Sequence, residues 1–199
     1  TIENPTDQDV LFLGLFDTYC FLDILRNFTV FEPVDGRIIK KIPRYQQFRA
    51  VHKTIERLVE GETPEEKSGV IWHTQGSGKS LTMVFLTVKM RREPKLRDYK
   101  LVFLTDRTQL DNQLTSTFSN AQGESVRHAD AVKSLKELLS SDASDIITAM
   151  VQKFQESADE FEFPVLNESE KIIVLADEAH RTQYGTLGAA INTAIPNAP

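Results

Sequence analysis

The sequence is poor in cysteine and has no long apolar run. Cys20 is the single cysteine among 199 residues, so an internal disulfide is impossible, which suits a reducing compartment. The most apolar stretch, LFLGLFDTYCFLDIL, contains Asp17 and Asp23 and is too short to cross a bilayer. It also lacks the basic start and the small-residue cleavage site of a signal peptide. We therefore predict a soluble, cytoplasmic protein with no membrane partner.

Basic residues are also fewer than acidic residues. The chain has 23 Lys and Arg against 29 Asp and Glu, which gives a net charge of −6. This composition gives no support for a nucleic-acid partner, which usually leaves a basic footprint, so such a partner must be inferred from motifs. Cysteine and histidine at zinc-binding spacing are absent. A hydrophobic content of 40% allows an ordinary packed core.

The apolar pattern changes character along the chain. Residues 8–28 are predicted as one amphipathic helix, residues 29–42 as two short strands around a turn at Asp35 and Gly36, and residues 44–60 as a helix. Beyond these, the predicted strands are residues 69–73, 99–105, 144–151 and 171–178, and the predicted helices are residues 79–92, residues 130–140 and a segment around Leu110, Leu114 and Phe118. This alternation predicts an α/β fold with a parallel sheet covered by helices on both faces. Ligands would then gather at the carboxyl ends of the strands.

A phosphate-binding loop is indicated by the letters HTQGSGKS, which follow a predicted strand and open a predicted helix. The common pattern is G-x-x-x-x-G-K-[ST], and only its first position differs here, where His73 stands. Gly76 and Gly78 let backbone amides turn toward a polyphosphate, and the helix N-terminus favours an anion. Lys79 would reach the outer phosphates, and the Ser80 hydroxyl would bind Mg²⁺. The alternative is a Gly-Ser turn that precedes a helix by chance.

Two adjacent acids, Asp177 and Glu178, end the apolar run of the last predicted strand. Asp177 would hold Mg²⁺ directly or through water, and Glu178 would orient and deprotonate an attacking water molecule. An exposed Asp-Glu pair is the alternative, although exposed acids rarely end so apolar a run. The loop and the acids together predict a site that binds and hydrolyses a nucleotide with Mg²⁺.

With both motifs in place, the chain resembles the first RecA-like lobe of a superfamily 2 helicase or translocase. More narrowly, it resembles the R (restriction, motor) subunit of type I restriction-modification enzymes. Four stretches carry the resemblance: IWHTQGSGKSLTM, VFLTDRTQLDNQL, VLADEAHRTQYG and RNFTVFEPVDGRIIKKIPRYQQFRAV. In that family His73 is usual at the first loop position. The resemblance implies a RecA-like P-loop NTPase lobe over residues 43–199, truncated before motif III, after a helical and hairpin connector from a nuclease domain over residues 1–42.

The resemblance also implies that the nucleotide is ATP. It assigns the reading of adenine to Gln47, with Gln46 as the alternative if the register differs, because a carboxamide can donate and accept hydrogen bonds at once. A surface glutamine on an amphipathic helix is the structural alternative. Further nucleotide-binding residues that it implies are Thr74, Gln75, Ser77 and Tyr45.

Contacts with double-stranded DNA are implied by the same resemblance. The residues that match DNA-contacting motifs of the family are Thr105, Arg107, Thr148 and Gln152. Such contacts position the protein on its track without reading sequence, and Arg107 could instead form a salt bridge within the lobe. His180 and Arg181 would couple the nucleotide site to the rest of the motor, with a buried core histidine as the alternative for His180.

The family implies a larger machine around this chain. Its R subunit couples ATP hydrolysis to movement along DNA and to cleavage, and it assembles with methylation and specificity subunits. We therefore expect a second motor lobe and the nuclease residues to lie outside this chain, which alone would hydrolyse little ATP. Open alternatives are lobe 1 of another superfamily 2 DNA helicase or repair translocase, a DEAH-type RNA helicase and a non-catalytic nucleotide-binding module. An ABC-type ATPase is disfavoured because no LSGGQ-like signature is present.

Overall fold

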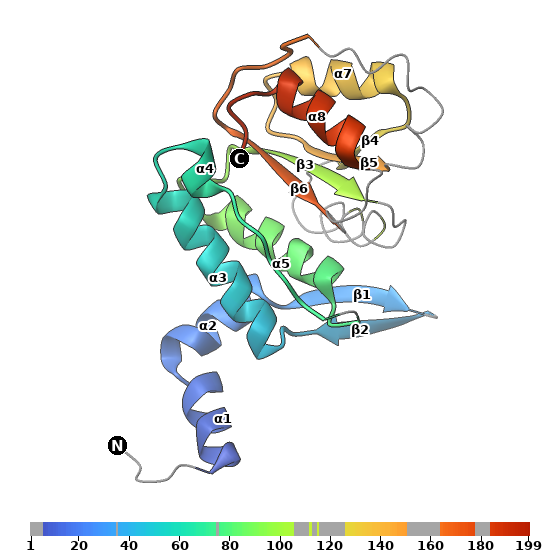
Figure 1. Ribbon diagram of the computed structural model, residues 1–199. Coiled ribbons are helices and arrows are strands. Elements are labelled where there is room, and N and C mark those ends of the chain that lie inside the picture. The colour runs from blue at the N-terminus through green and yellow to red at the C-terminus, as the bar shows by residue number, and fades with distance from the viewer. Residues whose placement is uncertain are drawn as a thin grey trace.

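Figure 1 shows the protein as a computed structural model. The structure describes residues 6–34, 36–74, 76–105, 112, 115, 126–150, 164–177 and 184–199. The helices are α1 (Asp7–Leu15), α2 (Thr18–Asn27), α3 (Tyr45–Glu60), α4 (Pro64–Lys67), α5 (Lys79–Arg92), α7 (Val132–Ser140) and α8 (Tyr184–Ala194). The strands are β1 (Val30–Val34), β2 (Arg37–Lys41), β3 (Lys100–Thr105), β4 (Val126–Ala129), β5 (Ile146–Met150) and β6 (Ile172–Ala176). Within these ranges no helix combines the length and the apolar character that crossing a membrane requires.

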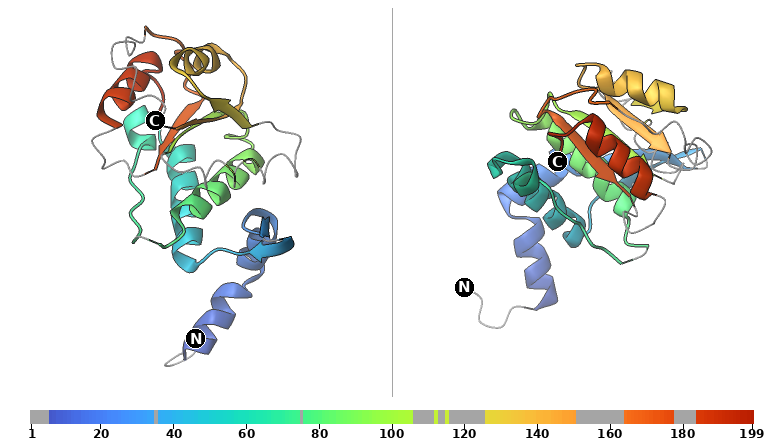
Figure 2. Two further views of the ribbon diagram at one scale, coloured as in Figure 1. Left: turned by 90° about the vertical axis from the view of Figure 1, so that its right-hand side faces the viewer. Right: turned by 45° about the horizontal axis from the view of Figure 1, so that its top comes forward.

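A four-stranded parallel sheet lies at the centre, in the order β4-β5-β3-β6. Side chains alternate between its faces, so β3 directs Leu101 and Phe103 into one apolar cluster and Val102 and Leu104 into another. Helices α3 and α5 cover the first face, and α7 and α8 cover the second (Figures 1 and 2). The predicted α/β fold, with a parallel sheet covered on both faces, is confirmed.

Helices α3 and α5 pack side by side, and this packing sets the position of the N-terminus of α5. Helix α3 buries Val51, Ile55 and Leu58, which are three or four residues apart and therefore share one stripe. Helix α5 buries Phe85 completely, in the apolar cluster that also contains residues of α3 and β3. It ends at Arg92, shortly before Pro94, which cannot continue a helix.

The region before α3 differs in part from the prediction. The single helix predicted over residues 8–28 is wrong, because the chain turns between α1 and α2. The Asp17 carboxylate accepts hydrogen bonds from the N–H groups of Tyr19 and Cys20 and so caps α2. The predicted hairpin is confirmed, since β1 and β2 pair antiparallel and Gly36 adopts φ +74° in the turn.

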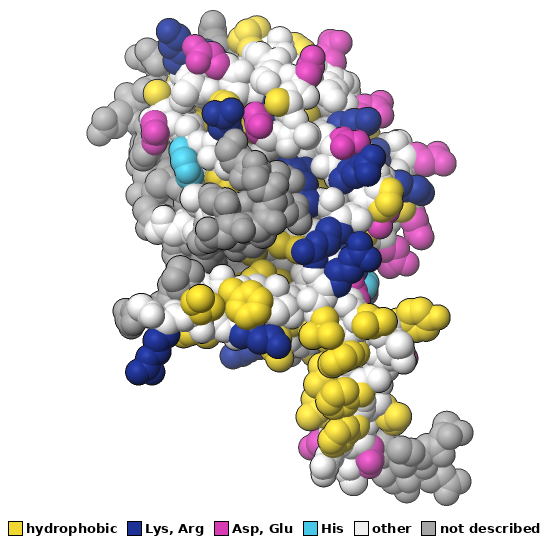
Figure 3. Space-filling view, turned by 180° about the vertical axis from the view of Figure 1, so that it is seen from behind, with side chains coloured by type: hydrophobic (Ala, Val, Ile, Leu, Met, Phe, Trp, Pro, Cys, Tyr) yellow, Lys and Arg dark blue, Asp and Glu magenta, His cyan; other side chains and the backbone are white. Residues whose placement is uncertain are grey.

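A buried aromatic side chain of this N-terminal region packs into the main core. Phe28 is completely buried, and its ring centroid lies 5.6 Å from that of Phe85 on α5 and 4.8 Å from that of Phe48 on α3. Helix α1, by contrast, projects from the body and buries none of its residues. Figure 3 shows apolar side chains gathered along this projection. In α1, Leu11 and Leu13 are 59% and 61% exposed. The predicted boundary after residue 42 stays a prediction.

The strand predicted over residues 69–73 is not formed, so that prediction is wrong. Val70 and Trp72 are 94% and 91% exposed, and the segment runs without a strand partner. On the nearby strand β6, the N–H of Val174 donates instead to the carbonyl of Pro199, at 3.1 Å. An apolar run becomes a strand only where a neighbouring strand completes its hydrogen bonds.

Three elements are missing from the prediction, namely the one-turn helix α4, strand β4 and helix α8, and one predicted element cannot be compared. Strand β4 has the letters VRHA, too short and too polar to stand out as a strand. Helix α8 carries no charged residue that would mark an exposed face. The helix predicted around Leu110, Leu114 and Phe118 lies outside the described residues.

Candidate nucleotide-binding site

The loop that leads into α5 has two residues in the left-handed region of backbone space. Gly76 has φ +76° and Gly78 has φ +82°, a conformation that costs about 1–2 kcal/mol for a residue with a Cβ. Ser77 donates its N–H to the Thr74 carbonyl at 3.2 Å, which closes a turn. Gly78 caps α5, and its carbonyl accepts the N–H of Thr82 at 3.1 Å. The two glycines therefore allow a tight turn that ends at a helix N-terminus.

The first turn of α5 contains Lys79 and Ser80, both of which are half-buried. The backbone N–H groups of a first turn have no partner within the helix, and the helix dipole adds partial positive charge there. Thr74 at the start of the turn is exposed, and Ser77 is half-buried. Polar backbone, a cation and hydroxyl groups are thus gathered where an anion would be stabilised.

Gln47, in the first turn of α3, packs against this loop and is 3% exposed. Its Nε2 donates to the Gly78 carbonyl at 3.0 Å and lies 3.4 Å from the Ser77 carbonyl oxygen. Its Oε1 accepts the backbone N–H of Arg44 at 2.8 Å. Gln47, which was predicted to read adenine, is therefore hydrogen-bonded to the backbone of the phosphate loop. The reading of adenine stays a prediction.

The neighbours of Gln47 on α3 face outward. Tyr45 is 68% exposed, and its hydroxyl accepts a hydrogen bond from Nη1 of Arg49 at 3.0 Å. Gln46 is exposed as well. Neither side chain contacts the loop in the hydrogen bonds that the structure shows, so the nucleotide contact predicted for Tyr45 stays a prediction.

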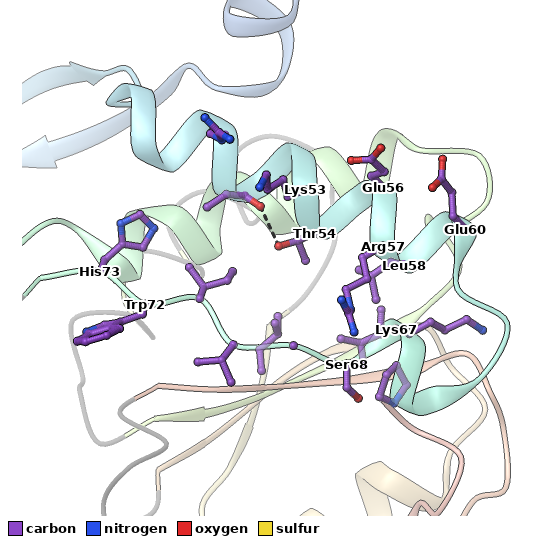
Figure 4. A pocket seen from close by; sticks show the side chains of 18 of the residues that line it. Lys53, Thr54, Glu56, Arg57, Leu58, Glu60, Lys67, Ser68, Trp72 and His73 are labelled. Atoms are coloured by element: carbon purple, nitrogen blue, oxygen red, sulfur yellow. Dashed lines mark hydrogen bonds between the residues drawn. The ribbon is translucent and has the colours of Figure 1, made fainter.

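A pocket of about 880 Å³ lies between α3, residues 67–73 and β6 (Figure 4). Lys53 and Arg57 line it from α3, Trp72 lines it from the segment before the loop, and His73 lines it from the first position of the loop. Tyr45 and the alternative adenine reader Gln46 line it, but the other described residues that were predicted to bind the nucleotide or Mg²⁺ do not. The pocket therefore borders the loop but is not the predicted phosphate site.

Asp177 follows β6 directly, at the carboxyl end of the strand. Its N–H donates to the Leu104 carbonyl of β3 at 2.9 Å, and its side chain is 2% exposed. Burying a carboxylate is costly unless a cation or hydrogen bonds compensate. Carboxylate and hydroxyl oxygens are ligands of Mg²⁺, so the chemistry of Asp177 and Ser80 suits the Mg²⁺ role predicted for them, which stays a prediction. No group of three His, Cys, Asp or Glu suited to a metal occurs in the described part of the chain.

Two predicted DNA contacts lie on β3 and β5, the two central strands of the sheet. Thr105 ends β3 and is completely buried, and Thr148 in β5 is 3% exposed. The Thr148 hydroxyl lies 3.0 Å from Nδ1 of His128. In this structure neither side chain reaches the surface, and their DNA contacts stay predictions.

The remaining predicted site residues cannot be placed. Those outside the described residues are Gln75, Arg107, Gln152, Glu178, His180 and Arg181.

One polar cluster joins α2, α3 and α5 and is absent from the sequence-based prediction. The Asp23 carboxylate accepts hydrogen bonds from Nζ of Lys89 at 2.7 and 2.8 Å, from Nε2 of His52 at 2.6 Å and from the Asn27 side chain. Burial raises the pKa of Asp23, but these hydrogen bonds outweigh it and hold the pKa well below its ordinary value. No local pattern could predict partners 29 and 66 positions away.

Comparison with known protein families finds one family that matches both the fold and the loop. Residues 46–199, which are most of the chain and include the loop and the acids, match the family described as SWI2/SNF2 ATPase. The chain belongs to the SWI2/SNF2 ATPase family. Membership of this family suggests that the protein uses ATP.

Several curated proteins that are similar to this chain are named as subunits of type I restriction enzymes. The putative MjaIXP endonuclease subunit of Methanocaldococcus jannaschii is 40% identical over 98% of this chain and 19% of its own length. The HindI endonuclease subunit of Haemophilus influenzae is 38% identical over 86% of this chain and 17% of its own. The C-terminal part of the putative MpnIIP endonuclease subunit of Mycoplasma pneumoniae is 30% identical over 76% of this chain and 77% of its own.

These relatives confirm the resemblance to R subunits of type I restriction enzymes. The chain spans about a fifth of the length of the first two relatives.

Proposed function

We propose that this chain is the ATP-binding motor lobe of a type I restriction enzyme R subunit. In the intact protein, ATP hydrolysis would drive movement along double-stranded DNA before the DNA is cleaved. The observation that carries the proposal is the glycine turn at the N-terminus of α5, in a chain of an ATPase family whose relatives are type I endonuclease subunits.

The loop residues would divide the work of holding the phosphates. Backbone N–H groups at the start of α5 would donate to phosphate oxygens, and the Lys79 ammonium would contact the outer phosphates. Ser80 and Asp177 would hold Mg²⁺, which neutralises charge that develops on the transferred phosphoryl group. Burial of Asp177 at the end of β6 supports this role because it fixes the carboxylate in one place.

The catalytic and coupling roles follow from the residues next to Asp177. Glu178 would orient and deprotonate the attacking water, and His180 and Arg181 would transmit the state of the nucleotide to the rest of the motor. Thr105, Arg107, Thr148 and Gln152 would contact the DNA backbone. The methylation and specificity subunits of a type I complex would supply recognition of the DNA site.

The test uses the longer protein assembled with its partner subunits and compares Glu178→Gln with Glu170→Gln. Glu170 is an exposed acid before β6 and serves as the matched control. We expect Glu178→Gln to lower DNA-stimulated ATP hydrolysis by about 10²–10⁴-fold while ATP binding is retained, because a general base is lost. Normal turnover by Glu178→Gln would disprove the catalytic assignment, and the absence of DNA-stimulated turnover in the unmodified complex would disprove the motor.

A further inference from the structure

We infer that a basic patch, formed by Arg26, Arg92, Lys95 and Arg97, binds the phosphate backbone of double-stranded DNA. The choice of DNA as the partner rests on the proposed function. The patch lies at the C-terminal end of α5, whose 14 residues separate it from the phosphate loop by about 20 Å. It is therefore a second contact, distinct from the DNA contacts predicted on β3 and β5.

The first argument is a local reversal of charge. The chain has a net charge of −6, yet residues 89–100 contain six Lys and Arg against two Asp and Glu. Three of the six cations serve the fold, since Lys89 binds Asp23 and since Arg91 and Lys100 donate hydrogen bonds to backbone carbonyls. The three that remain exposed are Arg92, Lys95 and Arg97.

The second argument is that two guanidinium groups are held near each other. Arg92 ends α5, and its Nη1 donates to Oδ1 of the buried Asn27 at 3.2 Å. Arg26 lies in the last turn of α2, beside Asn27. Partial desolvation and then the charge of Arg26 lower the pKa of Arg92 from its ordinary value. Neither arginine has a carboxylate partner in the described part of the chain, so an anion between them would relieve their repulsion.

The third argument is that the backbone under the patch is fixed while its side chains reach solvent. After α5 the N–H groups of Leu96 and Arg97 both donate to the Glu93 carbonyl at 2.9 Å. Arg91 donates to the Arg97 carbonyl, also at 2.9 Å. The Arg97 side chain is 64% exposed and lies 3.7 Å from Asp98, an exposed pair that contributes little. Figure 3 shows Lys and Arg side chains gathered beside the base of the apolar projection.

The spacing of charge favours duplex DNA over an acidic protein. A duplex carries one phosphate charge per about 1.7 Å of its axis, so it can meet several fixed cations at once. Arginine also matches two phosphate oxygens with two N–H groups. Such contacts position the duplex without reading its sequence. Arg26 belongs to the region predicted as the connector from a nuclease domain, so the patch would hold DNA between the motor and the place of cleavage.

The test is the salt dependence of binding between the 199-residue chain and a labelled duplex of about 30 bp, measured by fluorescence anisotropy at about 20–200 mM salt. Arg26→Gln and Arg92→Gln should each lower the slope of log affinity against log salt by about 0.9, and the double variant by about 1.8. Lys133→Gln removes the same charge from an exposed position on α7 and should leave the slope unchanged. Arg92→Lys alters the contact with Asn27 but keeps the charge, so it should retain the slope, which a merely structural role does not predict.

Two outcomes would overturn the inference. One is that the arginine variants have the same slope as Lys133→Gln, or that the unmodified chain does not bind duplex at about 20 mM salt. The other is that poly-glutamate binds in a way that depends on Arg26 and Arg92 while duplex DNA does not, because the patch would then take an acidic protein.

The inference and the proposed function can fail separately. DNA-stimulated ATP hydrolysis is measured in the longer protein, assembled with its partner subunits, for the same variants. If the unmodified complex shows no such hydrolysis, the proposed motor fails, and the salt slopes still decide whether the patch binds DNA. If hydrolysis is stimulated and the slopes are equal in all variants, the proposed function stands and this inference falls.

Discussion

Replacing Asp23 by asparagine tests how firmly α2 is held to the helix that begins at the phosphate loop. The Asp23 side chain is 17% exposed, and its partner Lys89 is 15% exposed. Lys89 Nζ also lies 5.4 Å from the centroid of the Phe28 ring. Asparagine keeps the shape of Asp23 but leaves the Lys89 ammonium without an opposite charge.

The size of the effect follows from these contacts. Removing one partner of a buried ion pair costs about 3–5 kcal/mol, while the pair with His52, whose side chain is 42% exposed, contributes much less. Since Asp23 and Lys89 retain some contact with water, we expect a loss near the lower limit, about 3 kcal/mol. For a chain of this size that loss corresponds to a fall in melting temperature of roughly 6–12 °C.

The assay is thermal unfolding at pH 7, followed by circular dichroism. Asp98→Asn is the control, because Asp98 is 67% exposed and lies 3.7 Å from Arg97, and an exposed pair contributes about 0–1 kcal/mol. If Asp23→Asn melts within a degree of the unmodified chain, the cluster does not hold α2 in place and the reasoning is refuted.

The same variant gives a pH test with a definite sign. The pKa of Asp23 is held below its ordinary value of 3.8, so its contribution to stability is present above that pH and is lost as the pH falls toward the lower folded pKa. The stability difference between the unmodified chain and Asp23→Asn should therefore be full at neutral pH and shrink below about pH 4. A difference that stays constant down to about pH 2.5 would contradict this origin.

Two further predictions concern the sheet and the loop. Lys100 is 3% exposed and donates hydrogen bonds to the last carbonyls of α7. Lys100→Met should therefore lower the free energy of unfolding by about 1–3 kcal/mol, measured by chemical denaturation. The control is Lys133→Met, which should leave that free energy unchanged because Lys133 is exposed. Gly76→Ala and Gly78→Ala should each cost about 1–2 kcal/mol of backbone strain. Only the second crowds Gln47, so Gly78→Ala should weaken nucleotide binding more than Gly76→Ala, and equal losses in a titration would contradict the contact.

Local sequence patterns predicted the elements whose burial shows directly in the order of their own residues. Helix α3 shows its buried stripe directly in the sequence, and β3 is a continuous apolar run because both of its faces are covered. The hairpin follows from its glycine turn. Residues 8–28 misled the prediction because Asp17 begins a new helix inside one apolar pattern. Residues 69–73 misled it because their composition suits a strand, but the structure offers no partner strand.

The candidate site was predictable where its residues are consecutive and unpredictable where distant residues meet. The glycines, Lys79 and Ser80 follow one another, so their placement at a helix N-terminus follows from the order of the letters. Asp177 is buried at a strand end, as the apolar run before it suggests. The hydrogen bonds of Gln47 to the loop join residues 30 and 31 positions apart, and only the packing of α3 on α5 brings them together.

The central claim is that the loop at the start of α5 binds ATP with Mg²⁺. Isothermal titration of the 199-residue chain with a non-hydrolysable ATP analogue, with Mg²⁺ and with EDTA, tests it most directly. Lys79→Ala is the test variant, and Lys53→Ala, an exposed lysine that lines the neighbouring pocket, is the control. We predict Mg²⁺-dependent binding that weakens about 10- to 150-fold in Lys79→Ala, the range of one charge-assisted hydrogen bond, and is unchanged in Lys53→Ala. Equal binding by the unmodified chain and Lys79→Ala would contradict the claim.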